Sequence, residues 1–110
     1  MPFIVLDTKI TGYLLNALGP LPARGKASFF LSLGYSPERP EEMRRSLLAH
    51  PAAANLVSDS TAINGYGRKL VFECELPGVP NGRRYCVRTV WLEIGTDFRL
   101  ITAYPRDPQI

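Results

Sequence analysis

Apolar residues recur at helical spacing in the first half of the chain and at alternating positions in much of the second half. The helical spacing predicts three helices, over residues 9–16, over residues 22–33 and from about residue 41 to residue 50. Gly34 is a natural stop for the second helix, and Glu41 places a negative charge in the first turn of the third, where the helix dipole favours it. The N-terminal half is therefore expected to be helical.

Four β-strands are expected in the second half, where β-branched and aromatic residues are frequent. They cover residues 55–63, 68–76, 85–94 and 98–104. Turn-forming residues leave short connections between these strands, and strands joined by short connections pair antiparallel. The expected fold class is α+β, with about three N-terminal helices packed on one face of a four-stranded antiparallel β-meander.

Length and charge narrow the kind of protein further. The chain has 110 residues, enough for one hydrophobic core, so residues 1–110 are expected to form a single α+β domain. Ten of the thirteen basic residues are arginine, whose planar guanidinium suits phosphate and carboxylate and stacks on nucleobases. This composition favours an anionic partner such as RNA or an acidic protein. The formal net charge is only +3, so an ordinary soluble surface is the other interpretation.

The sequence shows no pattern typical of a signal peptide, a membrane span or a metal site. The apolar run from Phe3 to Leu6 is too short for a signal peptide, and no stretch approaches the roughly 20 apolar residues of a membrane span. A cytoplasmic protein without a membrane partner is expected. Cys74 and Cys86 are too few for a zinc site. Two buried free thiols are the favoured interpretation and a cross-strand disulfide the other; no metal and no cofactor are expected.

Arg88 is the anomalous residue of the third expected strand. Alternation places it on a face whose other members are apolar, and a charge in such surroundings needs a partner or a polar opening. It could form an ion pair with Glu73 or Glu75, or it could bind a ligand. The apolar members of its face are Cys86, Val90, Leu92 and Ile94.

Three further polar residues lie on the last two strands. Thr89 follows Arg88, and Thr102 and Tyr104 lie at the end of the last strand, where alternation groups them with Phe98 and Leu100. Together with Arg88 they offer a guanidinium, two hydroxyls and a phenol to an anion. Thr and Tyr are also common in strands for purely structural reasons.

Two residues of the helical half are further candidates. His50 is the chain's single histidine, and its unperturbed pKa makes it suitable for proton transfer. It could equally serve to end the third helix, where the dipole favours a positive charge. Lys26 lies on the polar side of the second helix, where a solvated lysine is the common outcome.

Four segments resemble an uncharacterised bacterial family, a domain of unknown function. They are residues 9–16 (Lys-Ile-Thr-Gly-Tyr-Leu-Leu-Asn), residues 25–34, residues 87–91 and residues 99–105. The Thr-Ala-Tyr-Pro sequence that closes the last segment is also similar to the end of many bacterial toxins of the barnase–EndoU–colicin–RelE ribonuclease superfamily. That superfamily packs N-terminal helices against a four-stranded antiparallel sheet.

The resemblance to ribonuclease toxins implies metal-independent cleavage of RNA. In this reaction the ribose 2′-hydroxyl attacks the adjacent phosphate, which requires a base, an acid and cations. By this resemblance Arg88 would bind the phosphate with support from Lys26, His50 or Tyr104 would transfer protons, and Thr102 would orient the substrate. EndoU-like toxins use two histidines and this chain has one, which weakens the role of His50. Additional substrate contacts are expected from Thr89 and Arg99.

The resemblance also implies partners. RNA would be the substrate, and a toxin would require a cognate inhibitor, expected to be acidic and to cover the cationic site. A homodimer is a further expectation. The alternative function is a non-enzymatic protein-interaction or dimerising module with the same fold.

Overall fold

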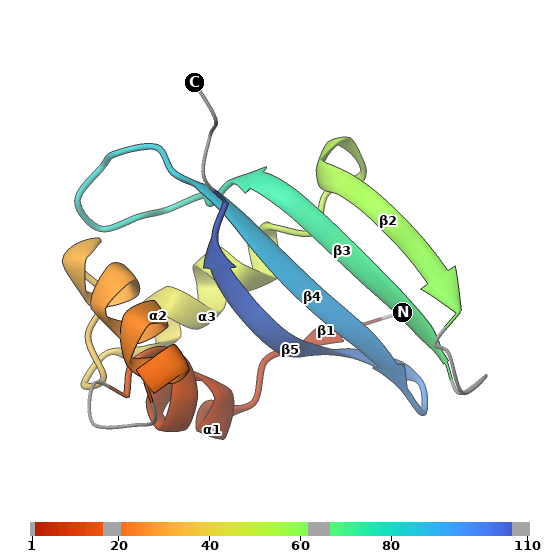
Figure 1. Ribbon diagram of the computed structural model, residues 1–110, viewed down its shortest axis with the longest axis horizontal. Coiled ribbons are helices and arrows are strands. Elements are labelled where there is room, and N and C mark those ends of the chain that lie inside the picture. Colours follow the sequence, from red (N-terminus) through yellow and green to blue (C-terminus); the bar gives the residue numbers. More distant parts are fainter. Residues whose placement is uncertain (1, 17–20, 62–66, 107–110) are drawn as a thin grey trace.

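The computed structural model describes residues 2–16, 21–61 and 67–106 (Figure 1). Within these ranges no helix is both long and apolar enough to cross a membrane. The predicted turn at residues 64–67 lies largely outside the described residues. The helical elements are α1 (Asp7–Lys9), which continues into a π-helical turn η1 (Ile10–Leu14), α2 (Leu21–Ser32), α3 (Pro40–Ala49) and a 3-10 turn η2 (Ala53–Asn55).

In the described part of the chain, five strands form one sheet of order β1-β5-β4-β3-β2. The strands β2 to β5 pair antiparallel, whereas β1 pairs parallel with β5 and places Phe3 opposite Phe98. The α+β class with N-terminal helices is therefore confirmed, and the prediction of a four-stranded antiparallel sheet is corrected to a five-stranded mixed sheet. The strands are β1 (Phe3–Ile4), β2 (Leu56–Thr61), β3 (Arg68–Glu75), β4 (Cys86–Ile94) and β5 (Asp97–Pro105).

The hydrophobic core lies between the helices and one face of the sheet, against which α3 is seen in Figure 1. On β4 the inward residues are Val87, Thr89 and Trp91, each 0% exposed. Arg88 and Val90 alternate with them and are half-buried on the opposite face. Arg88 therefore does share a face with apolar residues, as predicted, but that face is the open one. The helices contribute Phe30, Met43 and Leu47 to the core, and Leu33 joins them just after the end of α2.

A β-bulge in β5 changes which residues face the core. Val90 pairs with Thr102 but Trp91 pairs with Leu100, so Ile101 is the extra residue. Before the bulge Leu100 is buried, and after it Ala103 is buried. The bulge therefore turns Thr102 to the open face. The expectation that Thr102 and Tyr104 share a face with Phe98 and Leu100 was wrong, because strict alternation ignores an inserted residue.

The two cysteines are free thiols, but they are not both buried. Cys74 is exposed and Cys86 is half-buried. The register places Cys74 opposite Val87 and Cys86 opposite Glu75, so the two cysteines are offset by one position. Cys74 also has a φ of 96°, which is uncommon for a residue with a Cβ and interrupts the alternation of β3. Burial is the main reason that the pKa of Cys86 is raised to about 11, which disfavours its thiolate.

His50 lies in the core, where it is 0% exposed. Its Nε2 lies 2.8 Å from the carbonyl oxygen of Cys74, which can only accept, so Nε2 carries the proton. Nδ1 then accepts from the Thr89 hydroxyl at 2.8 Å, and Thr89 in turn accepts from the Trp91 indole at 2.9 Å. This chain of hydrogen bonds satisfies every polar group involved and ties α3 to β3 and β4.

The state of His50 predicts how stability depends on pH. Burial is the main cause that lowers its pKa in the folded protein, so the unfolded chain binds the proton more tightly. The stabilisation is therefore complete above the unfolded pKa of about 6.5 and is lost as pH falls below it. Denaturant titrations from pH 8 to pH 5 should show the midpoint falling in the acidic range. His50→Gln should flatten that dependence; a midpoint equally pH-dependent in the variant would contradict this account.

Candidate functional site

Three polar side chains meet where α2 and η1 approach the far end of β5. The Lys26 ammonium donates to the Tyr13 hydroxyl at 2.5 Å and to the Thr102 hydroxyl at 3.1 Å. The two hydroxyls are 3.1 Å apart, so the three groups form a closed triangle. Lys26 also lies 5.0 Å from the centre of the Tyr13 ring, and Lys9 lies at the same distance from that ring.

A second group lies on β3, β4 and the end of β5. The Arg88 guanidinium donates to Glu73 at 2.6 Å and to the Tyr104 hydroxyl at 3.2 Å. Arg106 donates to the other oxygen of Glu73 at 3.3 Å. Glu73 is 14% exposed and Arg88 35%, so the carboxylate is the less exposed member of the pair. The sequence had suggested Glu73 as one of two partners for Arg88.

The Tyr104 ring joins the two groups. Its centre lies 5.6 Å from the Lys26 ammonium and 5.9 Å from the Arg88 guanidinium carbon. Together they form what we call the cationic cluster. Among the described residues it contains four cations and one carboxylate, so it can attract an anion. The cluster consists of Lys9, Tyr13, Lys26, Glu73, Arg88, Thr102, Tyr104 and Arg106.

Local backbone features position these side chains. Tyr13 lies in the π-helical turn η1, and π-helical turns occur often at functional sites because the extra residue redirects a side chain. The neighbouring Ile10 and Leu14 are 0% exposed and anchor that turn in the core. Thr102 reaches the open side through the bulge of β5, and the antiparallel register places Tyr104 directly opposite Arg88.

Electrostatics at the site lower the pKa of Tyr13. Burial by itself raises the pKa of Tyr13, but the hydrogen bonds from Lys26 and Thr102 and the charges of Lys26 and Lys9 outweigh it, and the net pKa is lowered. The hydrogen bonds to Tyr104 and to Glu73 raise the pKa of Arg88, which stays protonated. Tyr13 thus loses its proton more readily than an ordinary tyrosine, and Arg88 is a fixed positive charge.

Four of the predicted catalytic residues come together in this cluster: Arg88, Tyr104, Thr102 and Lys26. His50 does not, because it lies buried on the core side of the sheet. The roles of the four in catalysis remain predictions.

The two predicted substrate contacts also lie elsewhere. Thr89 is buried on the core side, bonded to His50 and Trp91. Arg99 is near the start of β5, 4.0 Å from Asp97, and within the described residues its buried Nε has no hydrogen-bond partner. Neither residue belongs to the cationic cluster.

Sequence reasoning missed Tyr13, Lys9 and Arg106. Tyr13 stands among leucines in a helical pattern, where an aromatic residue usually indicates core. A signal was available, because Lys9 and Tyr13 both lie in the first of the segments that resemble the uncharacterised family. That segment therefore supplies two side chains of the cationic cluster as well as core residues.

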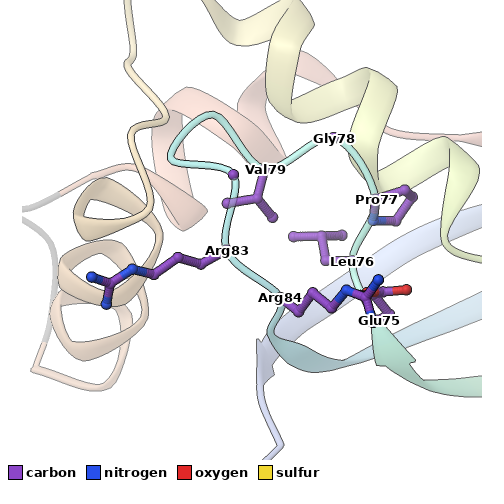
Figure 2. Close-up of a pocket in the computed structure, with 8 residues that line it drawn as sticks. Glu75, Leu76, Pro77, Gly78, Val79, Arg83 and Arg84 are labelled. Carbon is purple, nitrogen blue, oxygen red and sulfur yellow. The ribbon is translucent and has the colours of Figure 1, made fainter.

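A hollow of about 370 Å³ lies at the loop between β3 and β4 (Figure 2). Leu76 and Val79 line it with apolar surface. Arg84 is paired with Glu75 at 3.0 Å, and Figure 2 shows Arg83 pointing away from this pair. The hollow thus lacks the converging charges of the cationic cluster.

In the described residues, no group of three or more His, Cys, Asp or Glu side chains could hold a metal ion.

Residues 2–107 match the model of a family described as a domain of unknown function, DUF6883. The chain belongs to this family, which confirms the resemblance noted in the sequence. Comparison with curated proteins gives no match.

A solved structure shares the fold. It is a chain of the contact-dependent growth inhibition toxin–immunity protein complex from Klebsiella pneumoniae 342, with a TM-score of 0.73 and 17% identity. The similarity covers 94% of this chain and 99% of that chain. At this identity the likeness establishes the common fold.

The lowered pKa of Tyr13 predicts a distinct titration. Ultraviolet absorbance of the phenolate should show that Tyr13→Phe removes a component with a midpoint below the ordinary value of about 10. Lys26→Met should move that component upward, because the main stabilising hydrogen bond and charge are lost. Tyr35→Phe is the matched control: its pKa is raised mainly by burial, so it should remove a component above 10. A Tyr13 component at or above 10 would disprove the assignment.

Proposed function

We propose that this protein is a metal-independent endoribonuclease of toxin type, with its active site at the cationic cluster. The observation that carries the proposal is the convergence of Lys26, Arg88, Thr102 and Tyr104 with Tyr13 on one side of the sheet. The fold shared with a chain of a toxin–immunity complex gives it independent support.

Arg88 and Lys26 bind the scissile phosphate. Glu73 fixes the Arg88 guanidinium, so this cation loses little freedom when it binds an oxyanion. Lys26 has three N–H donors, of which Tyr13 and Thr102 accept two, and the third is left for a phosphate oxygen. Two cations beside the same phosphate stabilise the additional negative charge that develops as the 2′-oxygen attacks.

Two phenols transfer the protons. Tyr13 reacts as the phenolate, a form that its lowered pKa makes more accessible, and takes the proton of the ribose 2′-hydroxyl as that oxygen forms a bond to phosphorus. The bond from phosphorus to the 5′-oxygen breaks, and Tyr104, polarised by Arg88, gives its proton to the leaving oxygen. The products are a 2′,3′-cyclic phosphate and a 5′-hydroxyl. His50 has no part in this scheme.

A cognate inhibitor is part of the same proposal. An acidic protein laid over the cationic cluster would pair with Lys9, Arg106 and the substrate-binding cations and so exclude RNA. The toxin–immunity pairing of the structural neighbour supports a partner of this kind.

Cleavage assays on bulk tRNA and mRNA in EDTA test the proposal. The wild type should cleave, leaving cyclic phosphate and 5′-hydroxyl ends. Arg88→Ala, Tyr104→Phe and Tyr13→Phe should each reduce the rate by roughly 100-fold or more, because each removes a charge or proton-transfer group used in the transition state. Arg68→Ala is the matched control, since Arg68 pairs with Asp59 elsewhere on the sheet. Equal rates in all four variants and the wild type would refute the proposal.

A non-enzymatic interaction module is the alternative, favoured by one observation. The edge strand β2 is exposed along its whole length, with Leu56 42% and Val57 55% exposed, and such an edge can pair with a partner strand. Induced expression in bacteria separates the two functions. A toxin should arrest growth, and Arg88→Ala should relieve the arrest, whereas an interaction module should permit growth equally well with or without Arg88.

A further inference from the structure

The open face of the sheet carries a hollow of about 360 Å³, and most of its lining residues have no role in the reaction described above. All its lining residues belong to β3, β4 and β5, so helices take no part in its walls. We call it the outer groove. It is lined by Lys69, Val90, Leu92, Ile101, Thr102 and Tyr104.

The bulge of β5 creates the chemical character of the outer groove. Its extra residue, Ile101, is 38% exposed and lies beside Thr102 in the lining. Val90 and Leu92, half-buried on β4, extend the aliphatic surface across the sheet. The floor of the groove therefore offers exposed apolar area between polar ends. Covering this area with the flat apolar face of a ligand is favourable.

The two ends of the outer groove carry different groups. At one end are the hydroxyls of Thr102 and Tyr104, and at the other is Lys69, which pairs with Leu92 across the strands. Lys69 forms no salt bridge with any residue of the described ranges, and no carboxylate lines the groove. Arg88 and Leu92 are four residues apart on β4, which places Lys69 about 13 Å along the sheet from Arg88.

The outer groove is continuous with the cationic cluster. Thr102 and Tyr104 belong to both, so a molecule whose phosphate lies on Lys26 and Arg88 extends directly onto the aliphatic floor. A volume of about 360 Å³ is at the lower end of small-molecule sites, which suits one base with its ribose.

We propose that the outer groove binds the nucleobase that flanks the scissile phosphate in single-stranded RNA. The base lies with one face on Val90, Leu92 and Ile101 and its edge towards Tyr104, and Lys69 binds the following phosphate. This inference rests on the proposed function and adds the form of the substrate, because a paired base is stacked within its helix and cannot cover the groove.

The lining also predicts which bases are preferred. It contains no amide or carboxylate side chain, the groups that read base edges by paired hydrogen bonds. Recognition therefore depends on contact area, and a purine should be preferred to a pyrimidine. Discrimination between adenine and guanine should be weak.

Binding of uncleavable oligonucleotides tests the proposal. Short fluorescent single strands with 2′-O-methyl ribose would carry adenine, uracil or an abasic site at the flanking position, and anisotropy would give each Kd. The abasic strand should bind roughly tenfold more weakly than the adenine strand, with uracil between them. Leu92→Ala and Ile101→Ala should weaken binding of the adenine strand but not of the abasic strand. Val57→Ala, an exposed apolar residue on β2, is the matched control and should change neither.

The outcomes separate this inference from the proposed function. Equal Kd values for adenine and abasic strands, or equal weakening of both by Leu92→Ala, would overturn the base site even if RNA is cleaved. Base-dependent binding without any cleavage would retain the site and refute the nuclease. Failure of every strand to bind would overturn the base site and leave the groove to a protein partner.

Discussion

The register shift in β5 is the constraint on which the rest of this structure depends. Phe98 and Leu100 before the shift belong to the core, and an unbroken strand would send Thr102 and Tyr104 into the same core. One extra residue, Ile101, turns both polar side chains to the open face. The same strand thereby closes the hydrophobic core with its first half and supplies hydroxyls to the cationic cluster with its second.

The sheet separates two hydrogen-bonded groups of polar side chains, one in the core and one on the open face. On the core side, Thr89 and His50 satisfy each other without charge, which is the least costly way to bury polar groups. On the open side, Arg88 and Tyr104 are charged or polarised and partly accessible. Thr89 and Arg88 are adjacent in sequence, so the alternation of one strand places the first in the core and the second on the open face.

Much of the fold follows from the sequence, because long periodic segments record which face is buried. The three helical regions and the strands β2 to β5 were predicted within a few residues, whereas β1 was missed because two residues carry no period. Arg88 was identifiable from the sequence as a charge among apolar neighbours. The helical pattern did not indicate the position of Tyr13, because that position depends on a π-helical turn, and the true faces of Thr102 and Tyr104 depend on a bulge. Both features are set by tertiary packing, which local patterns do not contain.

The short strand β1 has a consequence for the order in which parts of the fold form. Phe3 pairs with Phe98, so β1 and β5 meet only after the long segment between them is available. The cationic cluster has the same requirement, since Tyr13 and Thr102 come from opposite ends of the sequence. Contacts between distant segments form late because closing long loops costs entropy. The helices and the strands β2 to β4 can therefore form before the cluster does, and β5 is the strand that brings the sheet and the cluster together.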